Sequence, residues 1–196
     1  MTWSLLGVLA LPVLPGGWAF GAPVVISQDE VVGVEWVGEG HVRIEVAGGE
    51  AEILGVEGTD EVVVRCRFAG GKGQPGEPEL PVYVLLMENP PEGKPRVSWR
   101  FEEETVVEGR VAPVMTHRPR YVDEGVYERE VVRVRSESVY SGAGIFPAKP
   151  VQIEWAKMGE RGFLRVAFYP VRYEPLGETI LVAERMVVDV MFGSED

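Results

Sequence analysis

The chain has one thiol, Cys66, and a thiol acts as a nucleophile only where its thiolate is stabilised. Its neighbours on the same side of an alternating pattern are the apolar residues Val62, Val64 and Phe68. Apolar surroundings raise the pKa of a thiol and make it a poor nucleophile. We therefore expect Cys66 to be a small core residue. A single cysteine also excludes an intramolecular disulfide and a thiolate-rich metal site.

The two histidines do not mark a catalytic group either. His41 follows the turn signal of residues 38–40, so we expect it at the solvated start of a strand. His117 lies in residues 113–120, which their prolines predict to be irregular. Neither imidazole has an obvious thiol or hydroxyl partner at a spacing that indicates a nucleophile and its base. We expect no catalytic residue, no metal site and no cofactor.

One segment differs from the rest of the chain in charge. The chain holds 31 Asp and Glu against 19 Lys and Arg, a net charge of −12. Residues 110–135 nevertheless carry a series of basic side chains: Arg110, His117, Arg118, Arg120, Arg129, Arg133 and Arg135. One interpretation is a polar strand pair with its connecting loop. The other is a loop that is offered to an acidic pocket on a partner protein.

The overall composition excludes several classes of function. A chain with a net charge of −12 repels phosphate backbones and anionic lipids, which argues against binding to nucleic acid or to a membrane surface. Its hydrophobic content of 45% is that of a folded chain rather than a disordered one. We therefore expect a folded acidic protein with no nucleic-acid partner and no membrane span in the mature chain.

The elements that must position these residues are predicted to be strands. Apolar residues recur with a period of two, which places them on one face of a strand. The alternating runs cover residues 42–46, 62–68, 97–101, 151–155, 164–168 and 186–192. Gly- and Pro-rich turn signals separate them, and no long segment has a helical period. We expect an all-β fold, an antiparallel two-sheet sandwich of jelly-roll type with few or no helices.

The start of the chain is predicted to lie outside this sandwich. Residues 1–22 hold no charged side chain, and a short apolar run there is followed by Ala19, Gly21 and Ala22. Small residues in these places suit cleavage by a signal peptidase. We expect residues 1–22 to be a secretory signal peptide and residues 23–196 to form one domain. The chain is then secreted to the extracellular space or the cell surface.

Two groups of residues carry a resemblance to a known family. Gly76, Pro78, Leu80 and Pro81 form a "G-x-P-x-L-P" pattern ahead of an apolar strand. Later in the chain come Arg161-Gly162, Pro170, Tyr173, Pro175 and Gly177. Together they resemble the propeptides of the gingipain family of secreted cysteine peptidases, over residues 70–192. Physically, the prolines favour extended backbone and frame a bend in which the Tyr173 ring packs inside, and Gly177 supplies a turn.

The resemblance implies a function. A β-sandwich propeptide of this kind keeps a caspase-like peptidase silent, or assists its folding, until the propeptide is removed. The catalytic residues then belong to the peptidase domain, so the chain itself is not expected to be an enzyme. The implied partner is the cognate catalytic domain, in the same chain or in another. If that peptidase prefers basic residues, Arg110, Arg118 or Arg120 is the candidate for its specificity pocket.

A second hypothesis is an extracellular sandwich that binds glycans or proteins. Trp36, Trp99 and Trp155 offer rings that stack on sugars. Against this, the alternating pattern places Trp99 and Trp155 on the core faces of their strands.

Overall fold

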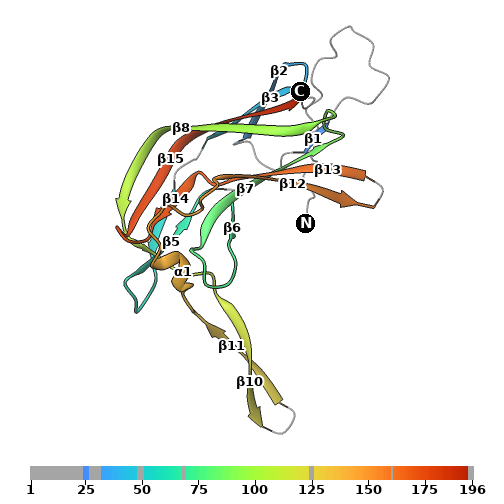
Figure 1. Ribbon diagram of the computed structural model, residues 1–196. Coiled ribbons are helices and arrows are strands. Elements are labelled where there is room, and N and C mark those ends of the chain that lie inside the picture. Colours follow the sequence, from blue (N-terminus) through green and yellow to red (C-terminus); the bar gives the residue numbers. More distant parts are fainter. Residues whose placement is uncertain are drawn as a thin grey trace, which may run out of the picture.

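The chain folds into two facing layers of strands, from one end of which a hairpin projects (Figure 1). The computed structural model describes residues 24–26, 32–47, 51–67, 69–123, 126–159 and 161–193. The expected signal peptide, residues 1–22, lies outside them. The prediction of an all-β, antiparallel two-sheet sandwich is confirmed.

The first sheet has the strand order β1–β7–β13–β12, and β6 also pairs with β7. Its strands are β1 (Val24–Ile26), β6 (Gly70–Lys72), β7 (Leu80–Glu88), β12 (Val151–Met158) and β13 (Arg161–Phe168). Among the described strands, β12 pairs with β13 alone and forms one edge of this sheet.

The second sheet is built on a long strand, β15 (Thr179–Gly193). β15 pairs along its whole length with β8 (Lys94–Glu108), which forms an edge of the sheet. On its other side, β15 pairs with two shorter strands in turn: β14 (Val171–Glu174) and β3 (His41–Ala47), beyond which lies β2 (Val32–Gly38).

The space between the sheets is filled by the apolar positions of the alternating runs. Residues of β3, β13 and β15 that share one face are fully buried: Val42, Ile44, Val46, Leu164, Val166, Met186, Val188 and Val190. This confirms the period-two pattern as the source of the core. Cys66 belongs to the same core, and burial raises the pKa of its thiol to about 11, so its expected role as a core residue is confirmed.

The expectation that Trp99 and Trp155 are core residues is wrong. The exposed fractions of their side chains are 42% and 59%. Trp99 lies on β8 and Trp155 on β12, and both strands are edges of their sheets. The period of two gives the face of a strand on which a side chain lies. It does not show whether another layer covers that face at the edge of the sheet.

A smaller assembly closes the end of the sandwich from which the hairpin projects. Strands β4 (Glu52–Gly55), β5 (Glu61–Arg65) and β9 (Arg110–Val111) form a three-stranded sheet in which β5 and β9 run parallel. The hairpin consists of β10 (Thr116–Asp123) and β11 (Val126–Val132), and a one-turn helix, α1 (Glu137–Tyr140), follows it. Within the described ranges, no helix is long and apolar enough to cross a membrane.

Candidate functional site

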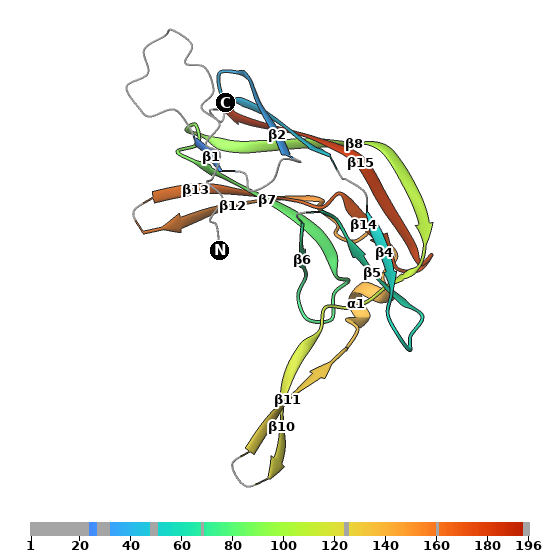
Figure 2. The ribbon, with the colours of Figure 1, turned by 180° about the vertical axis from the view of Figure 1, so that it is seen from behind.

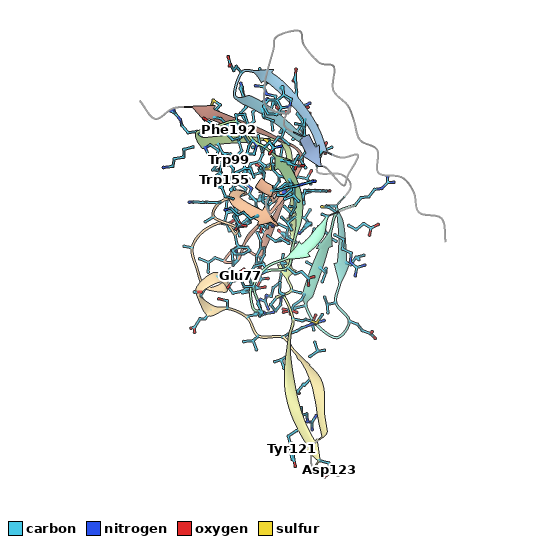
Figure 3. All side chains as sticks on the ribbon, turned by 90° about the vertical axis from the view of Figure 1, so that its right-hand side faces the viewer. Glu77, Trp99, Tyr121, Asp123, Trp155 and Phe192 are labelled. Atoms are coloured by element: carbon cyan, nitrogen blue, oxygen red, sulfur yellow. The ribbon has the colours of Figure 1, made fainter. Side chains whose placement is uncertain are left out.

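The basic segment found in the sequence forms the projecting hairpin. Strands β10 and β11 pair with each other in a two-stranded sheet of their own, with Arg118 opposite Glu130 and Arg120 opposite Glu128 (Figures 1 and 2). In Figure 3, Tyr121 and Asp123 lie at the far end of the hairpin, away from Glu77 in the body. Of the two interpretations, the strand pair is therefore present, and its projection makes it accessible to a partner.

The expectation that the prolines make residues 113–120 irregular is wrong for the second half of that segment. Pro119 lies within β10, where its register partner is Arg129. Proline cannot donate a hydrogen bond, so it is tolerated in strands that have an open side. Both strands of a two-stranded sheet have one, which explains why Pro119 does not interrupt β10.

The hairpin exposes apolar side chains that the sandwich does not cover. Met115 and Val134, on the two legs between hairpin and body, are each 45% exposed, and Val131 and Tyr121 are 52% and 59% exposed. An isolated two-stranded hairpin is only marginally stable in water. A hairpin with apolar side chains on its surface is typical of a segment that a partner covers.

The outgoing leg of the hairpin is joined to the body by main-chain hydrogen bonds. The amide of Glu79 donates to the carbonyl of Ala112 (3.0 Å), and that of Val114 donates to the carbonyl of Glu77 (2.8 Å). The amide of Ala112 donates in turn to Val62 of β5 (2.8 Å). Residues 112–114 therefore continue the pairing of β9 before the hairpin departs.

Gly76 connects the body to both legs of the hairpin. Its amide donates to the carbonyl of Val114 on the outgoing leg (3.1 Å), and its carbonyl accepts from the amide of Ser136 on the returning leg (2.8 Å). Its φ of 93° lies in the region that favours glycine. This is the glycine of the family pattern, and the structure gives it a role at the base of the hairpin.

Glu61 is the one charged residue that is buried among those the structure describes, with an exposed fraction of 7%. Its Oε1 accepts hydrogen bonds from Nε (3.1 Å) and Nη2 (2.6 Å) of Arg135 on the returning leg. Nη1 of Arg133 lies 3.8 Å from its Oε2. Charge-assisted bonds of this kind satisfy a carboxylate that has been removed from water. We refer to Gly76, Glu61 and Arg135 together as the hairpin base.

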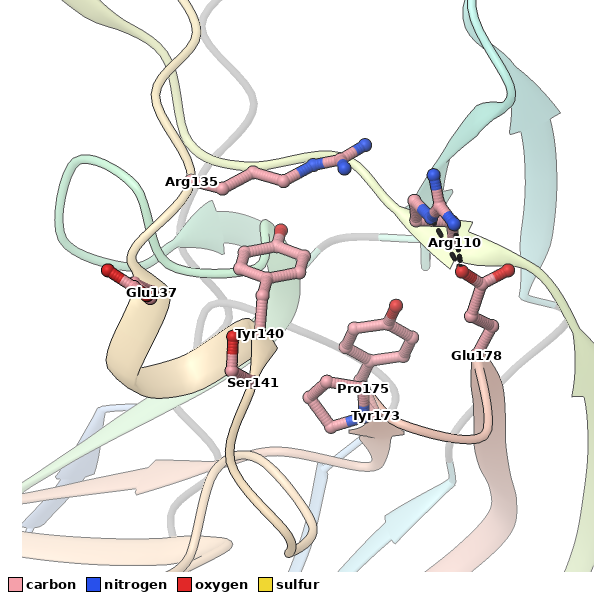
Figure 4. Close-up of a pocket in the computed structure, with 8 residues that line it drawn as sticks. All are labelled: Arg110, Arg135, Glu137, Tyr140, Ser141, Tyr173, Pro175 and Glu178. Carbon is pink, nitrogen blue, oxygen red and sulfur yellow. Dashed lines mark hydrogen bonds and ion pairs between the residues drawn. The ribbon is translucent and has the colours of Figure 1, made fainter.

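Arg110 lies on the body rather than on the hairpin. Its guanidinium donates to Glu178 Oε1 from Nε (2.7 Å) and Nη2 (Figure 4). Its Nη1 donates to Asp60 Oδ2 (2.6 Å). The hydrogen bond to Glu178 raises the pKa of Arg110. Of the three candidate arginines, Arg118 and Arg120 are thus on β10, while Arg110 is held in ion pairs at β9.

A pocket of about 380 Å³ lies beside the hairpin base, with Arg110, Arg135, Tyr140 and Tyr173 among its lining residues (Figure 4). The hydroxyl of Tyr140 donates to the carbonyl of Val111 (2.8 Å). Burial raises the pKa of both tyrosines, so both stay neutral at pH 7. Among the described residues, no thiol or imidazole belongs to the lining of this pocket.

The remaining residues of the family pattern lie in the core, at strand ends or in turns. Leu80 and Tyr173 are buried in the core, and Pro78 forms a bridge with Pro113 at the foot of the outgoing leg. Figure 4 shows the Tyr173 hydroxyl toward the pocket, with Pro175 beside the ring. The other members lie at strand ends or in turns: Pro81, Arg161, Gly162, Pro170 and Gly177.

Sequence reasoning missed the roles of Glu61 and Arg135. Their ion pair joins residues 74 positions apart in the chain. The cluster of basic residues was the available signal. Arg133 and Arg135 lie at the end of the basic segment, next to the acidic remainder of the chain, where a carboxylate partner can be expected.

Comparisons with known proteins agree on one family. The family model Propeptide_C25 matches residues 30–196. The complex of the pro- and mature domains of RgpB from Porphyromonas gingivalis has a similar fold, with a TM-score of 0.65 and 15% identity over 86% of each chain. A structure on the zymogenic latency of gingipain K from the same organism has a TM-score of 0.63 and 17% identity, over 89% of this chain and 100% of the other.

None of the curated proteins matches the chain in sequence. The comparisons do not support the second hypothesis, an extracellular binding module. They also fit a non-enzymatic chain, because the family is that of a propeptide and not of its catalytic domain. Since the family model covers most of the sequence, the chain belongs to the gingipain propeptides.

Proposed function

We propose that this propeptide keeps a gingipain-type cysteine peptidase domain inactive by placing the β10–β11 hairpin in its substrate cleft. The observation that carries the proposal is the hairpin itself, a two-stranded arm that projects from the sandwich and bears arginines. Extended segments are one of the forms in which peptides bind to other proteins. For the relative RgpB, a complex of pro- and mature domains is known, and we propose the same kind of assembly for this chain.

Arg118 and Arg120 are the proposed specificity residues. They stand two positions apart on β10, in register with Glu130 and Glu128 of β11. Arg120 is exposed. Arg110 would have to leave its ion pairs with Glu178 and Asp60 before it could enter a pocket on a partner. A carboxylate in the peptidase pocket is the expected counter-charge for the arginine that enters it.

The same contact is proposed to assist folding of the peptidase domain, because a partner that binds only the folded state stabilises that state by mass action. Refolding yields of the cognate catalytic domain with and without this chain test this role. An unchanged yield would restrict the propeptide to inhibition.

The family also bears on the export of the protein. Propeptides of this family belong to secreted peptidases. We propose that residues 1–22 are the secretory signal peptide and that residues 23–196 form the propeptide domain. Amino-terminal sequencing of the exported protein tests the boundary, which we expect near residue 22.

The inhibitory role is tested with the cognate catalytic domain and four forms of this chain: the parent, R118A, R120A and the double variant. Truncation of one partner of a buried, hydrogen-bonded ion pair across an interface costs about 2–5 kcal/mol. Loss of the arginine that enters the pocket should therefore weaken inhibition by at least about tenfold. The control is R161A, which removes an arginine that is 72% exposed on β13. Equal inhibition constants for all forms would refute the proposal.

A further inference from the structure

We propose that Gly76 and Glu61 are positioning residues, which fix the direction in which the hairpin leaves the sandwich and thereby determine how strongly the chain inhibits. This inference rests on the proposed function. It goes beyond that function because neither residue lies on the hairpin, and both belong to the body.

The direction of the hairpin depends on its foot, because among the described residues β10 and β11 form strand pairs with each other and with no other strand. From Met115 to Tyr121 the strand extends roughly 20 Å at about 3.4 Å per residue, and a tilt of about 10° at its foot moves that end by roughly 3.5 Å. A displacement of this size separates a side chain from a pocket that was built for it.

Gly76 fixes the two legs relative to each other. It is bonded to Val114 on one leg and to Ser136 on the other, so the two legs meet at a single residue of the body. A Cβ at this position would lie 2.9 Å from the carbonyl oxygen of Val134 and 3.2 Å from the amide nitrogen of Ser136. Both contacts are with the main chain of the returning leg. Any larger residue must therefore push that leg, and the hairpin with it.

Glu61 fixes the returning leg against the sheet of β5. The hydrogen bonds from Arg135 hold that leg one residue before Ser136, where Gly76 binds it. Arg133 approaches the other oxygen of the same carboxylate. A buried carboxylate is costly unless such partners satisfy it. The main-chain bond of Gly76 and the side-chain bonds of Glu61 thus act on consecutive residues of one leg.

Two substitutions test the inference, each with its own comparison. G76A forces the returning leg to move, whereas G159A places the same methyl group at another glycine of positive φ (65°), where a Cβ meets nothing within 4 Å. The pair separates backbone strain from displacement of the hairpin. E61A removes the acceptor for Arg135, and E61Q restores an oxygen without the charge. E61Q should therefore inhibit more strongly than E61A and less strongly than the parent.

Two measurements are made on the full chain. The first is the inhibition constant against the cognate catalytic domain. The second is the distance between spin labels on V106C in β8 and Y121C at the far end of β10, both exposed positions, in a C66A background. A residue that only stabilises the sandwich would change the melting temperature without changing this distance.

We expect G76A and E61A to weaken inhibition by at least about tenfold and to shift or broaden the distance distribution, while G159A stays within about twofold of the parent. Unchanged inhibition by G76A and E61A, alongside a loss in the R118A/R120A variant, would overturn this inference and leave the proposed function intact. Weaker inhibition with an unchanged distance would overturn it as well. If the arginine variants also inhibit normally, both proposals are wrong. Should G76A fail to fold, E61A and E61Q decide.

Discussion

Because β10 and β11 pair with each other and with no other described strand, we expect that the hairpin can be removed without loss of the sandwich. Thr116 and Val132 face each other at the foot of the hairpin. In an antiparallel pair, such residues are about 5 Å apart, a gap that a two-residue Asn-Gly turn closes. We therefore consider a variant in which Asn-Gly replaces residues 117–131.

The expected change in stability is small and favourable. An isolated two-stranded hairpin contributes about nothing to stability in water. The entropy of closing a loop scales as (3/2)RT ln n, so replacing residues 117–131 by two residues stabilises the fold by at most roughly 2 kcal/mol. By comparison, L164A opens a cavity at a fully buried position of β13 and should cost about 2–5 kcal/mol.

Urea denaturation of the parent, the shortened variant and L164A measures these differences, and inhibition of the catalytic domain is measured on the same samples. The shortened variant should unfold at a urea concentration equal to or above that of the parent and should no longer inhibit. A shortened variant that is less stable than the parent by more than about 2 kcal/mol would contradict the reasoning. The hairpin would then be part of the folding unit.

Three further predictions concern the body of the molecule. Burial raises the pKa of Asp189, but hydrogen bonds from His41 and Arg43 outweigh it and lower that pKa below its ordinary value. The stability that the parent gains over D189N should thus be fully present at about pH 5 and decline as the pH falls below it, in urea titrations from pH 5 to pH 2. Because the pKa of Cys66 is about 11, iodoacetamide at pH 8 should modify the native protein far more slowly than the protein in urea. The association rate with a basic catalytic domain should fall as NaCl is raised, given the net charge of −12, and a rate that is independent of salt would exclude electrostatic steering.

The sequence predicts the sandwich well because its core depends on a local pattern. Val42, Ile44 and Val46 are apolar at every second position, and all three are fully buried. The thiol of Cys66 follows the same rule. A period of two needs no knowledge of which strand lies next to which.

Local patterns do not show which distant strands pair with each other. The sequence places Trp99 and Trp155 on the correct type of element but does not reveal that their strands are edges. It also gives no indication that β5 and β9 run parallel, and that pairing is what puts Glu61 beside Arg110 in register and within reach of Arg135. Pro119 misleads for a related reason, since proline interrupts a central strand but not a strand with an open side.

The separate pairing of the hairpin has an evolutionary consequence. Residues that build the core and residues that we propose to contact the peptidase lie on different segments, so each set can drift under its own selection. A lineage could exchange the hairpin for one with a different specificity while the sandwich stays the same. A graft of the arm from one propeptide onto the sandwich of another should then transfer the preference for a target, provided that the recipient keeps a glycine and an acid where Gly76 and Glu61 stand.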